Sequence, residues 1–261
     1  MQKLVVHIPH AATAIPETDG FAVSKDIIEN EILQLTDWYT DDLFDAVDTE
    51  SIIFNYSRIF CDPERFSDDS LEPMAGVGMG VLYERTDDDQ IMRVISPELR
   101  EHILTNYYLR HHGKLAQAVR QQLEAYGKAL ILDAHSFPDI PLKKNSNKTM
   151  PRPDFNIGSD DFHTPAELIE ISATFFTEKG FTFGINWPFS GSIVPMEFYR
   201  KNKQVASVML EVNRRLYLIE GTKIKSANYL HIKQIVQEYM QLLKTELLKH
   251  SRPTSSGFSG F

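Results

Sequence analysis

The sequence has a single cysteine, Cys61, among 261 residues. An internal disulfide is therefore excluded, and we expect a cytoplasmic protein because so little cysteine is typical of a reducing compartment. No apolar run approaches the roughly 18 residues that a transmembrane helix needs. The amino terminus also lacks the apolar segment and small-residue cleavage site of a signal peptide. A membrane is thus not expected as a partner.

The sequence also has fewer basic than acidic residues, and it lacks the short motifs that mark common catalytic and metal sites. Lys and Arg number 27 against 36 Asp and Glu, which gives a formal net charge of −9. We expect no nucleic acid as a partner, because phosphate binding needs a basic surface. The sequence contains no His-Glu-x-x-His, Cys-x-x-Cys or Gly-x-Ser-x-Gly motif. Neither a local zinc signature nor a serine hydrolase is therefore indicated.

The length suits one domain, which we expect over residues 1–250, followed by a flexible Ser-, Gly- and Pro-rich tail at 251–261. Strand-like runs alternate with helical patterns, and this order predicts an α/β fold with a single, mixed but mostly parallel sheet flanked by helices. The polar stretch 138–153 is longer than a typical connection, so we expect it to be either a functional loop or partly disordered. We expect strands at 3–9, 51–56, 59–61, 128–134, 181–185 and 205–212, and helices at 25–48, 97–126, 164–180 and 226–249.

Three of the predicted strands each supply one ionisable side chain. His10 follows the first strand, His135 follows the run at 130–134, and Glu211 lies within 205–212. Ligands of open α/β sheets bind beyond the carboxyl ends of the strands, so these groups could converge. Imidazole suits zinc and similar metals. A lone histidine at a strand end is more often structural, but two with a carboxylate give the functional interpretation comparable weight.

Glu211 has two interpretations. An ionised carboxylate in an apolar strand is costly unless it is paired, so Glu211 could form an ion pair with Arg214 or Arg215. Alternatively, burial raises its pKa, and it acts as a general base on a metal-bound water.

Arg58 and Arg65 are the arginines that we expect to contact substrate. The guanidinium group matches carboxylates and developing oxyanions. Ion pairs with neighbouring acids are the alternative for both, and the candidates are Asp62, Glu64 and Asp68.

Several short segments, taken together and in order, resemble the N-formylglutamate amidohydrolase family. They are Ile8-Pro9-His10-Ala11, Thr36-Asp37-Trp38 with Leu43-Phe44-Asp45, Tyr56-Ser57-Arg58, Arg65 with Ser67-Asp68-Asp69, His112 with Leu115, Asp133-Ala134-His135-Ser136, Pro153 to Gly158, Phe189-Ser190-Gly191 and Leu210 to Arg214. The family is related to zinc carboxypeptidases, aspartoacylase and succinylglutamate desuccinylase. The resemblance therefore implies a zinc-exopeptidase-like (phosphorylase/hydrolase-like) fold.

The resemblance also implies a metal site. One Zn²⁺ per chain is expected, with another divalent metal as the alternative. His10 and His135 match the histidine ligands of the wider group. The glutamate ligand that relatives carry three residues after the first histidine is replaced here by Thr13, so we choose Asp37 as the carboxylate ligand.

Further roles follow from the same resemblance. Glu211 would be the catalytic acid–base, Arg58 would steady the oxyanion, and Arg65 would hold a substrate carboxylate. The remaining residues expected to bind substrate are His112, Asn156, Ser190 and Gly191.

The implied function is metal-dependent hydrolysis of N-formylglutamate, a step of histidine degradation, or of a similar small N-acyl amino acid. Glu64 stands where relatives have asparagine, and the segment Ser192 to Glu197 lacks an arginine that relatives carry. Hydrolysis of another N-acyl amino acid or small peptide is therefore the alternative. Thr13 motivates a second alternative, a non-catalytic scaffold. The oligomeric state is left open.

Overall fold

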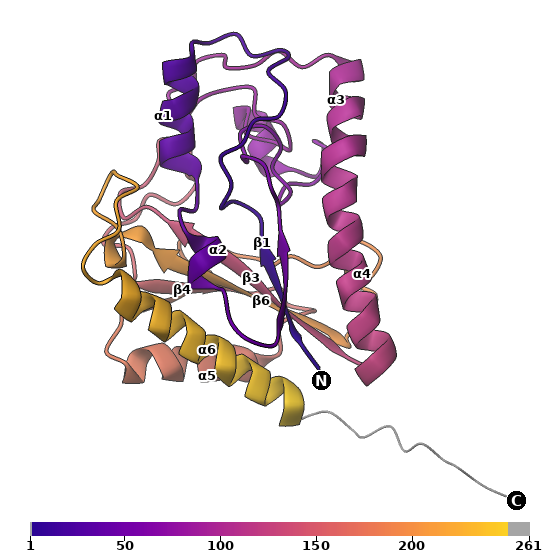
Figure 1. Ribbon diagram of the computed structural model, residues 1–261, viewed down its shortest axis with the longest axis vertical. Helices are drawn as coiled ribbons and strands as arrows, with labels where there is room; N and C mark the ends of the chain where they lie inside the picture. Colours follow the sequence, from indigo (N-terminus) through magenta and orange to yellow (C-terminus); the bar gives the residue numbers. More distant parts are fainter. Residues whose placement is uncertain (1, 250–261) are drawn as a thin grey trace, which may run out of the picture.

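The computed structural model describes residues 2–249, so the tail expected at 251–261 lies outside the described residues. Figure 1 shows a sheet with helices on both sides. The strands are β1 (Leu4–Ile8), β2 (Thr49–Ile53), β3 (Ala129–Phe137), β4 (Phe155–Gly158), β5 (Phe183–Ile185) and β6 (Val205–Asn213). The helices are α1 (Lys25–Leu35), α2 (Thr40–Leu43), α3 (Pro97–Ile103), α4 (Leu109–Tyr126), α5 (Ala166–Glu178) and α6 (Tyr229–Lys249), with short turns of other helix types at η1 (Pro73–Val77), η2 (Leu104–Tyr108) and η3 (Arg214–Leu216).

The strands form one six-stranded sheet in the order β2-β1-β3-β6-β4-β5. All neighbouring pairs are parallel except β4 and β6, which are antiparallel. The long connections that parallel pairing needs are supplied by the helices. The predicted α/β fold with a mixed, mostly parallel sheet is thus confirmed.

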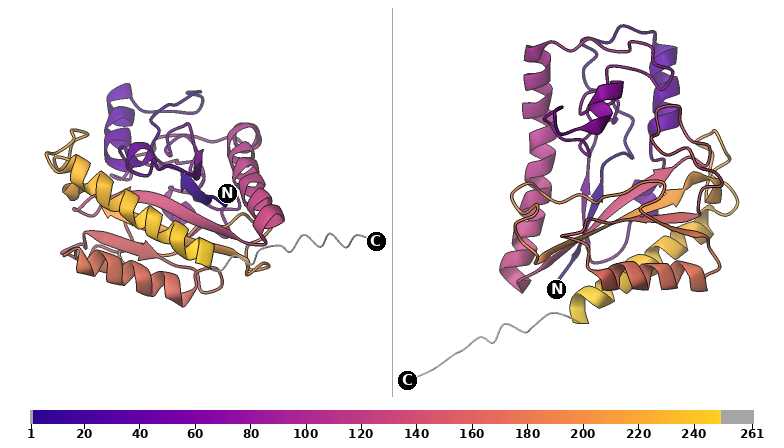
Figure 2. Two further views of the ribbon diagram at one scale, coloured as in Figure 1. Left: turned by 60° about the horizontal axis from the view of Figure 1, so that its bottom comes forward. Right: turned by 180° about the vertical axis from the view of Figure 1, so that it is seen from behind.

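The two faces of the sheet have different partners, as Figure 2 shows. Val6 and Leu132 pack in the core that includes α5 and α6, whereas Val5 and Ile131 pack against α4. Alternate side chains of a strand point to opposite faces. The same alternation places four polar side chains on the α4 face, beyond its apolar core: His7, Asp133, His135 and Glu211.

The helix predicted over 25–48 is confirmed only as far as Leu35, where the chain leaves the helix. Thr36 is extended, with φ −71° and ψ 134°. The Asp37 amide then donates to the carbonyl of His10 at 3.0 Å. This long-range hydrogen bond and the burial of Asp37 override the helical spacing of the apolar residues, which continues through the break.

Other boundaries also differ from the predictions. The segment 59–61 forms turns rather than a strand, and β4 was not predicted as a strand. The strand expected at 128–134 continues to Phe137 because β6 pairs along its whole length, so His135 lies within β3. Thr164-Pro165-Ala166-Glu167 has the pattern of a capping box, but none forms, since the Thr164 hydroxyl donates to the carbonyl of Ser207. The helix predicted at 97–126 is confirmed as α3, η2 and α4 in succession.

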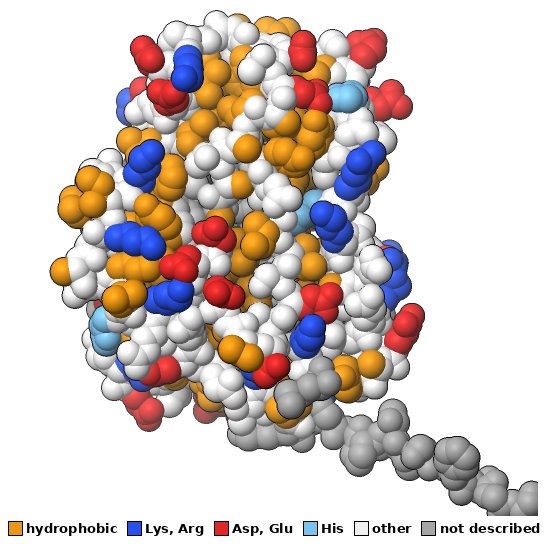
Figure 3. Space-filling model, viewed as in Figure 1, with side chains coloured by type: hydrophobic (Ala, Val, Ile, Leu, Met, Phe, Trp, Pro, Cys, Tyr) orange, Lys and Arg blue, Asp and Glu red, His pale blue; other side chains and the backbone are white. Residues whose placement is uncertain are grey.

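The surface carries charges of both signs around the face seen in Figure 3, with apolar side chains gathered in the upper half of that view. Among residues 2–249, no helix combines the length and apolar character that crossing a bilayer demands.

Candidate functional site

A cavity of about 160 Å³ lies over the carboxyl ends of the central strands. Its lining includes seven of the ten residues predicted for the site: His10, Asp37, Arg58, Arg65, His135, Ser190 and Glu211. Apolar side chains complete the wall, among them Leu35, Met79, Phe137, Leu142 and Phe189. Residues that are far apart in the sequence, from His10 to Arg214, therefore line the same cavity.

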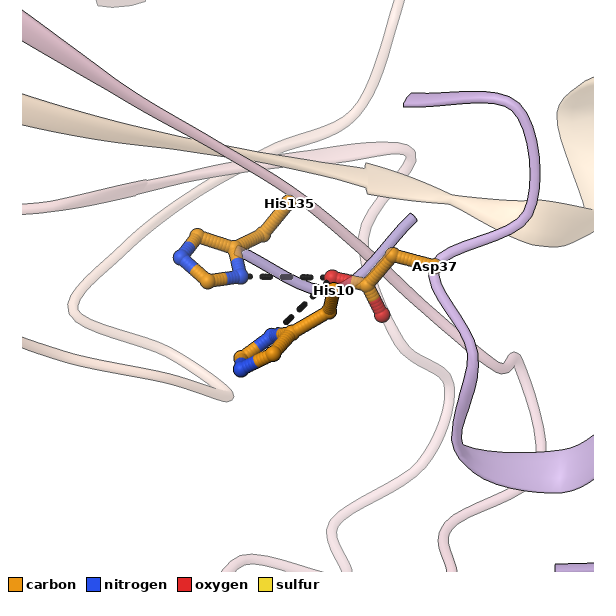
Figure 4. A group of neighbouring side chains, drawn as sticks. All are labelled: His10, Asp37 and His135. Atoms are coloured by element: carbon orange, nitrogen blue, oxygen red, sulfur yellow. Dashed lines mark hydrogen bonds and ion pairs between the residues drawn. The ribbon is translucent and has the colours of Figure 1, made fainter. Parts of the chain in front are cut away.

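Three potential metal ligands meet in this cavity. His10 and His135 both turn a ring nitrogen toward the carboxylate of Asp37, as Figure 4 shows. Asp37 Oδ2 lies 3.5 Å from His10 Nδ1 and 3.2 Å from His135 Nδ1. The three donor atoms lie within 4.8 Å of one another, and all three side chains are buried. Such a set of two imidazoles and one carboxylate is one that catalytic zinc sites use.

The surroundings of these donors fit a metal ion. His10 Nδ1 is buried and makes no hydrogen bond within the described part of the chain. The opposite nitrogen of each ring faces a buried carboxylate: His10 Nε2 lies 2.8 Å from Asp62, and His135 Nε2 lies 3.2 Å from Asp133. Carboxylates in this position orient metal-bound imidazoles and raise their basicity.

Asp37 is held in place from three sides. Its backbone amide bonds to His10, Ser136 N donates to Oδ2 at 3.2 Å, and Arg214 Nη2 donates to Oδ1 at 2.8 Å. Burial opposes ionisation, but the interactions with the His10 and His135 rings and the charge of Arg214 outweigh it. The pKa of Asp37 is therefore held well below its usual range. An ionised carboxylate at this point is ready to bind a cation.

Glu211 lines the cavity on the strand next to β3, where it pairs in register with His135. Its Oε2 is buried and has no hydrogen-bond partner among the described residues. Arg214 instead binds Asp37, and Arg215 binds Asp139 and Asp154, so neither forms the ion pair considered for Glu211. Burial raises the pKa of Glu211 to about 8, with the charge of Asp37 adding to the effect.

The two predicted arginines are held differently. Arg58 forms a buried ion pair with Asp62 at 2.9 Å, and its Nε also donates to the hydroxyl of Tyr83. The ion-pair interpretation is thus correct for Arg58, although Arg58 also lines the cavity. Arg65 has only longer approaches, 3.7 Å to Asp62 and 4.0 Å to Glu72. Its Nε is buried without a hydrogen bond in the described chain, so it retains a donor for a ligand.

Three predicted substrate-binding residues do not line the cavity. His112 Nε2 lies 3.0 Å from the carbonyl of Pro63, next to the segment that carries Arg65. Asn156 donates to the carbonyl of Phe189 and accepts from the amide of Trp187, so it fixes the loop that presents Ser190. Gly191 has φ +91°, a conformation that favours glycine. None of the three is part of the cavity lining.

Asp62, Asp133 and His7 were not singled out for the site by the sequence. Asp133 precedes His135 by two residues, and side chains two apart on a strand share a face, so this signal was available. His7 interrupts the apolar run of the first predicted strand, so it too could have been noticed. Asp62 lies in a turn, and no periodicity points to it.

Comparisons with known proteins were consistent with this geometry. Curated relatives from Pseudomonas aeruginosa and Pseudomonas putida, each named N-formylglutamate deformylase, are 26% identical over 229 residues, which span 83% of this chain and 82% of each relative. A solved N-formylglutamate amidohydrolase from Ralstonia eutropha superimposes with a TM-score of 0.82 at 20% identity and 95% coverage of both chains. A gene product of Agrobacterium tumefaciens gives a TM-score of 0.66 at 16% identity, covering 95% of this chain and 92% of its own.

The family comparison covers most of the chain. The model of the N-formylglutamate amidohydrolase family matches residues 2–218, a range that contains every residue lining the cavity. The chain belongs to the N-formylglutamate amidohydrolase family.

Proposed function

We propose that this protein hydrolyses the amide bond of N-formylglutamate in a zinc-dependent reaction. The observation that carries the proposal is the convergence of His10, Asp37 and His135 in a cavity that also contains Glu211. The names of the two Pseudomonas relatives support this choice of substrate. Water and N-formylglutamate would give formate and glutamate.

His10, Asp37 and His135 would hold the zinc. When bound, zinc supplies Lewis acidity and lowers the pKa of water to roughly 7. Glu211 accepts a proton from the attacking water and later delivers it to the leaving amine, so the carboxyl group begins and ends the cycle in the same state. Its elevated pKa suits both transfers near neutral pH.

The arginines of the cavity wall contribute charge. Arg58 steadies the oxyanion that develops at the formyl oxygen, since Asp62 and Tyr83 fix its Nε and Nη2 and leave Nη1 available. Arg65 binds a substrate carboxylate through its guanidinium group, whose nearest described acids lie 3.7 Å and 4.0 Å away.

Turnover of N-formylglutamate by zinc-loaded and chelator-treated protein tests the proposal, with release of the primary amine as the measurement. We expect hydrolysis that chelation abolishes and added zinc restores. Zinc-loaded protein that releases no amine from any N-acyl amino acid would contradict the proposal. A zinc content well below one per chain would favour the non-catalytic scaffold instead.

A second candidate function is hydrolysis of an N-acyl amino acid with one carboxylate. Four cationic side chains line the cavity: Arg58, Arg65, Lys144 and Arg214. Three of them already contact a carboxylate within 3.0 Å, so in the part of the chain that the structure describes Arg65 is the one of the four without such a close acidic partner. N-formylglutamate carries two carboxylates, and losing one charge-assisted contact costs about 1.5–3 kcal/mol.

A substrate panel separates the two candidates. It would compare kcat/KM for N-formylglutamate with values for N-formyl amino acids whose side chains are uncharged. A preference of tenfold or more for N-formylglutamate would rule out the second candidate.

A further inference from the structure

A second group of metal-ligating side chains lies behind the first. His7 Nδ1 is 2.9 Å from Asp133 Oδ1 and 2.9 Å from Glu64 Oε1. His135 Nε2, the ring nitrogen that faces away from Asp37, lies 3.2 Å from Asp133 Oδ1 and 3.9 Å from Glu64 Oε1. Four donor atoms from β1, β3 and the segment after Asp62 therefore lie close together.

Hydrogen bonds leave one member of this group unsatisfied. A neutral imidazole carries one ring hydrogen. The His7 Nδ1 and His135 Nε2 positions both have Asp133 Oδ1 as their hydrogen-bond partner. Glu64 Oε1 is buried and has no hydrogen bond within residues 2–249, although it lies as close to His7 Nδ1 as Asp133 does. A proton on His7 can serve only one of these two oxygens, whereas a central cation would contact both.

The distances match a four-coordinate site. Zinc bonds to nitrogen and oxygen of about 2.0–2.2 Å in a tetrahedron separate the donor atoms by about 3.3–3.6 Å. The four nitrogen–oxygen separations, 2.9, 2.9, 3.2 and 3.9 Å, lie on both sides of that range. Small shifts of the side chains would therefore accommodate the ion.

Neighbouring groups hold the donors in this arrangement. His7 Nε2 lies 2.8 Å from His111 Nε2, so a hydrogen on His7 Nε2 can be donated to His111, which leaves the Nδ1 lone pair for a cation. Asp133 Oδ2 accepts the amide of Ile193 at 3.0 Å, and this bond directs Oδ1 toward His7 and His135.

We propose that His7, Glu64, Asp133 and His135 Nε2 form a second divalent-cation site, suited to zinc and joined to the first site through the imidazole of His135. Binding on both ring nitrogens of His135 requires the loss of its ring hydrogen, which the second cation displaces into solvent. The two nitrogen and two oxygen donors would fill all four positions of a tetrahedral zinc ion, which is typical of a structural rather than a catalytic metal.

Metal stoichiometry tests this site on the full chain. Protein stripped with chelator would be titrated with Zn²⁺, passed through gel filtration and analysed for zinc per chain. We expect two zinc ions in the wild type, one in His7→Gln and one in Glu64→Gln. His10→Asn should also retain one, because it removes only the first site. His102→Gln, a histidine on the surface, is the control and should retain two.

Anomalous diffraction from crystals at the zinc absorption edge would locate the bound ions. We expect two zinc peaks, one on each side of the His135 ring. A wild type with one zinc per chain, or a folded His7→Gln protein with as many as the wild type, would overturn the second site. The proposed function is judged separately. One zinc with turnover leaves that function intact, whereas two zinc ions without turnover support the second site and contradict the function.

Discussion

Glu211 is a buried carboxylic acid on β6, and burial decides its chemistry. Transfer from water raises the cost of the charged form, and no cation forms an ion pair with this side chain in the described part of the chain. Its pKa of about 8 lies near the pH at which proton transfer in both directions is efficient. The same residue on an exposed strand would be a permanent anion and a weak base.

Replacing Glu211 with glutamine should remove turnover while keeping the fold. Glutamine has almost the same shape but cannot accept the proton, so we expect kcat/KM to fall by about 10²- to 10⁴-fold. Steady-state kinetics with zinc analysis of the same samples would measure this. A Glu211→Gln protein with unimpaired turnover and full zinc content would refute the assigned role.

The pH dependence of stability should report the same side chain. In metal-free protein the folded pKa of Glu211, about 8, lies above the unfolded value of 4.5. Both states are protonated below pH 4.5, so Glu211 then imposes no penalty. As the pH rises from 4.5 to 8, the unfolded state ionises first, and Glu211 destabilises the fold by about 1.4 kcal/mol per pH unit.

Urea unfolding at pH 5 and pH 7 in the presence of chelator would measure this effect. Relative to the wild type, Glu211→Gln should gain about 2–3 kcal/mol between these two pH values. The exposed Glu167→Gln is the control and should gain nothing. An equal response of both variants would show that Glu211 is ionised in the folded protein.

At the scale of elements, the loop after β5 forms one wall of the cavity and rests on the end of β4. Asn156 on β4 binds the loop at Trp187 and Phe189. Gly158 ends the strand where the loop passes closest. A Cβ built at Gly158 would lie 2.3 Å from the carbonyl oxygen of Gly191 and 2.3 Å from Met209 Cε. The absence of a side chain there lets the loop approach the sheet.

Gly158→Ala should therefore displace the loop that carries Phe189 and Ser190. Overpacking of this kind costs about 1–3 kcal/mol, and a small displacement of a substrate-contacting wall lowers kcat/KM by about 10- to 100-fold. Gly113→Ala is the control, because a Cβ at that exposed helical position meets nothing within 4 Å. It should keep full activity and gain about 0.5–1 kcal/mol. Equal activity of the two variants would contradict the packing argument.

At the scale of the whole molecule, the first metal site connects distant parts of the chain. His10 follows β1, Asp37 follows α1, and His135 lies on β3. A metal bound to all three links these segments only in the folded state, so binding adds to the free energy of unfolding. At a free zinc concentration 1,000 times the Kd, the gain is about 4 kcal/mol.

Zinc should therefore raise the melting temperature by about 8–16 °C, since 1 kcal/mol shifts the melting temperature of a protein of this size by about 2–4 °C. Thermal unfolding with excess zinc or with chelator would measure the shift. His10→Asn should lose most of the shift that the first site contributes. A wild type that melts at the same temperature under both conditions would contradict metal binding in the folded protein.

The class of the fold could be predicted from the sequence, but the ends of several helices and strands could not. The alternation of apolar runs with helical patterns was sufficient for the α/β class and the mostly parallel sheet. It failed at Thr36, where apolar residues keep a helical spacing although the chain turns to bring Asp37 beside His10. It also ended β3 too early, because pairing with β6 overrides the polar residues from Asp133 to Ser136.

The types of residue that the site requires could likewise be named from the sequence, since His10, His135 and Glu211 stand out as ionisable groups at apolar strands. Their partners could not. Only the tertiary structure places Asp62 behind His10, directs Arg214 to Asp37 rather than Glu211, and brings His7 within reach of Glu64. The physical reason is that hydrophobic periodicity is local along the chain, whereas ion pairs and metal ligands depend on distances that packing of the whole sheet sets.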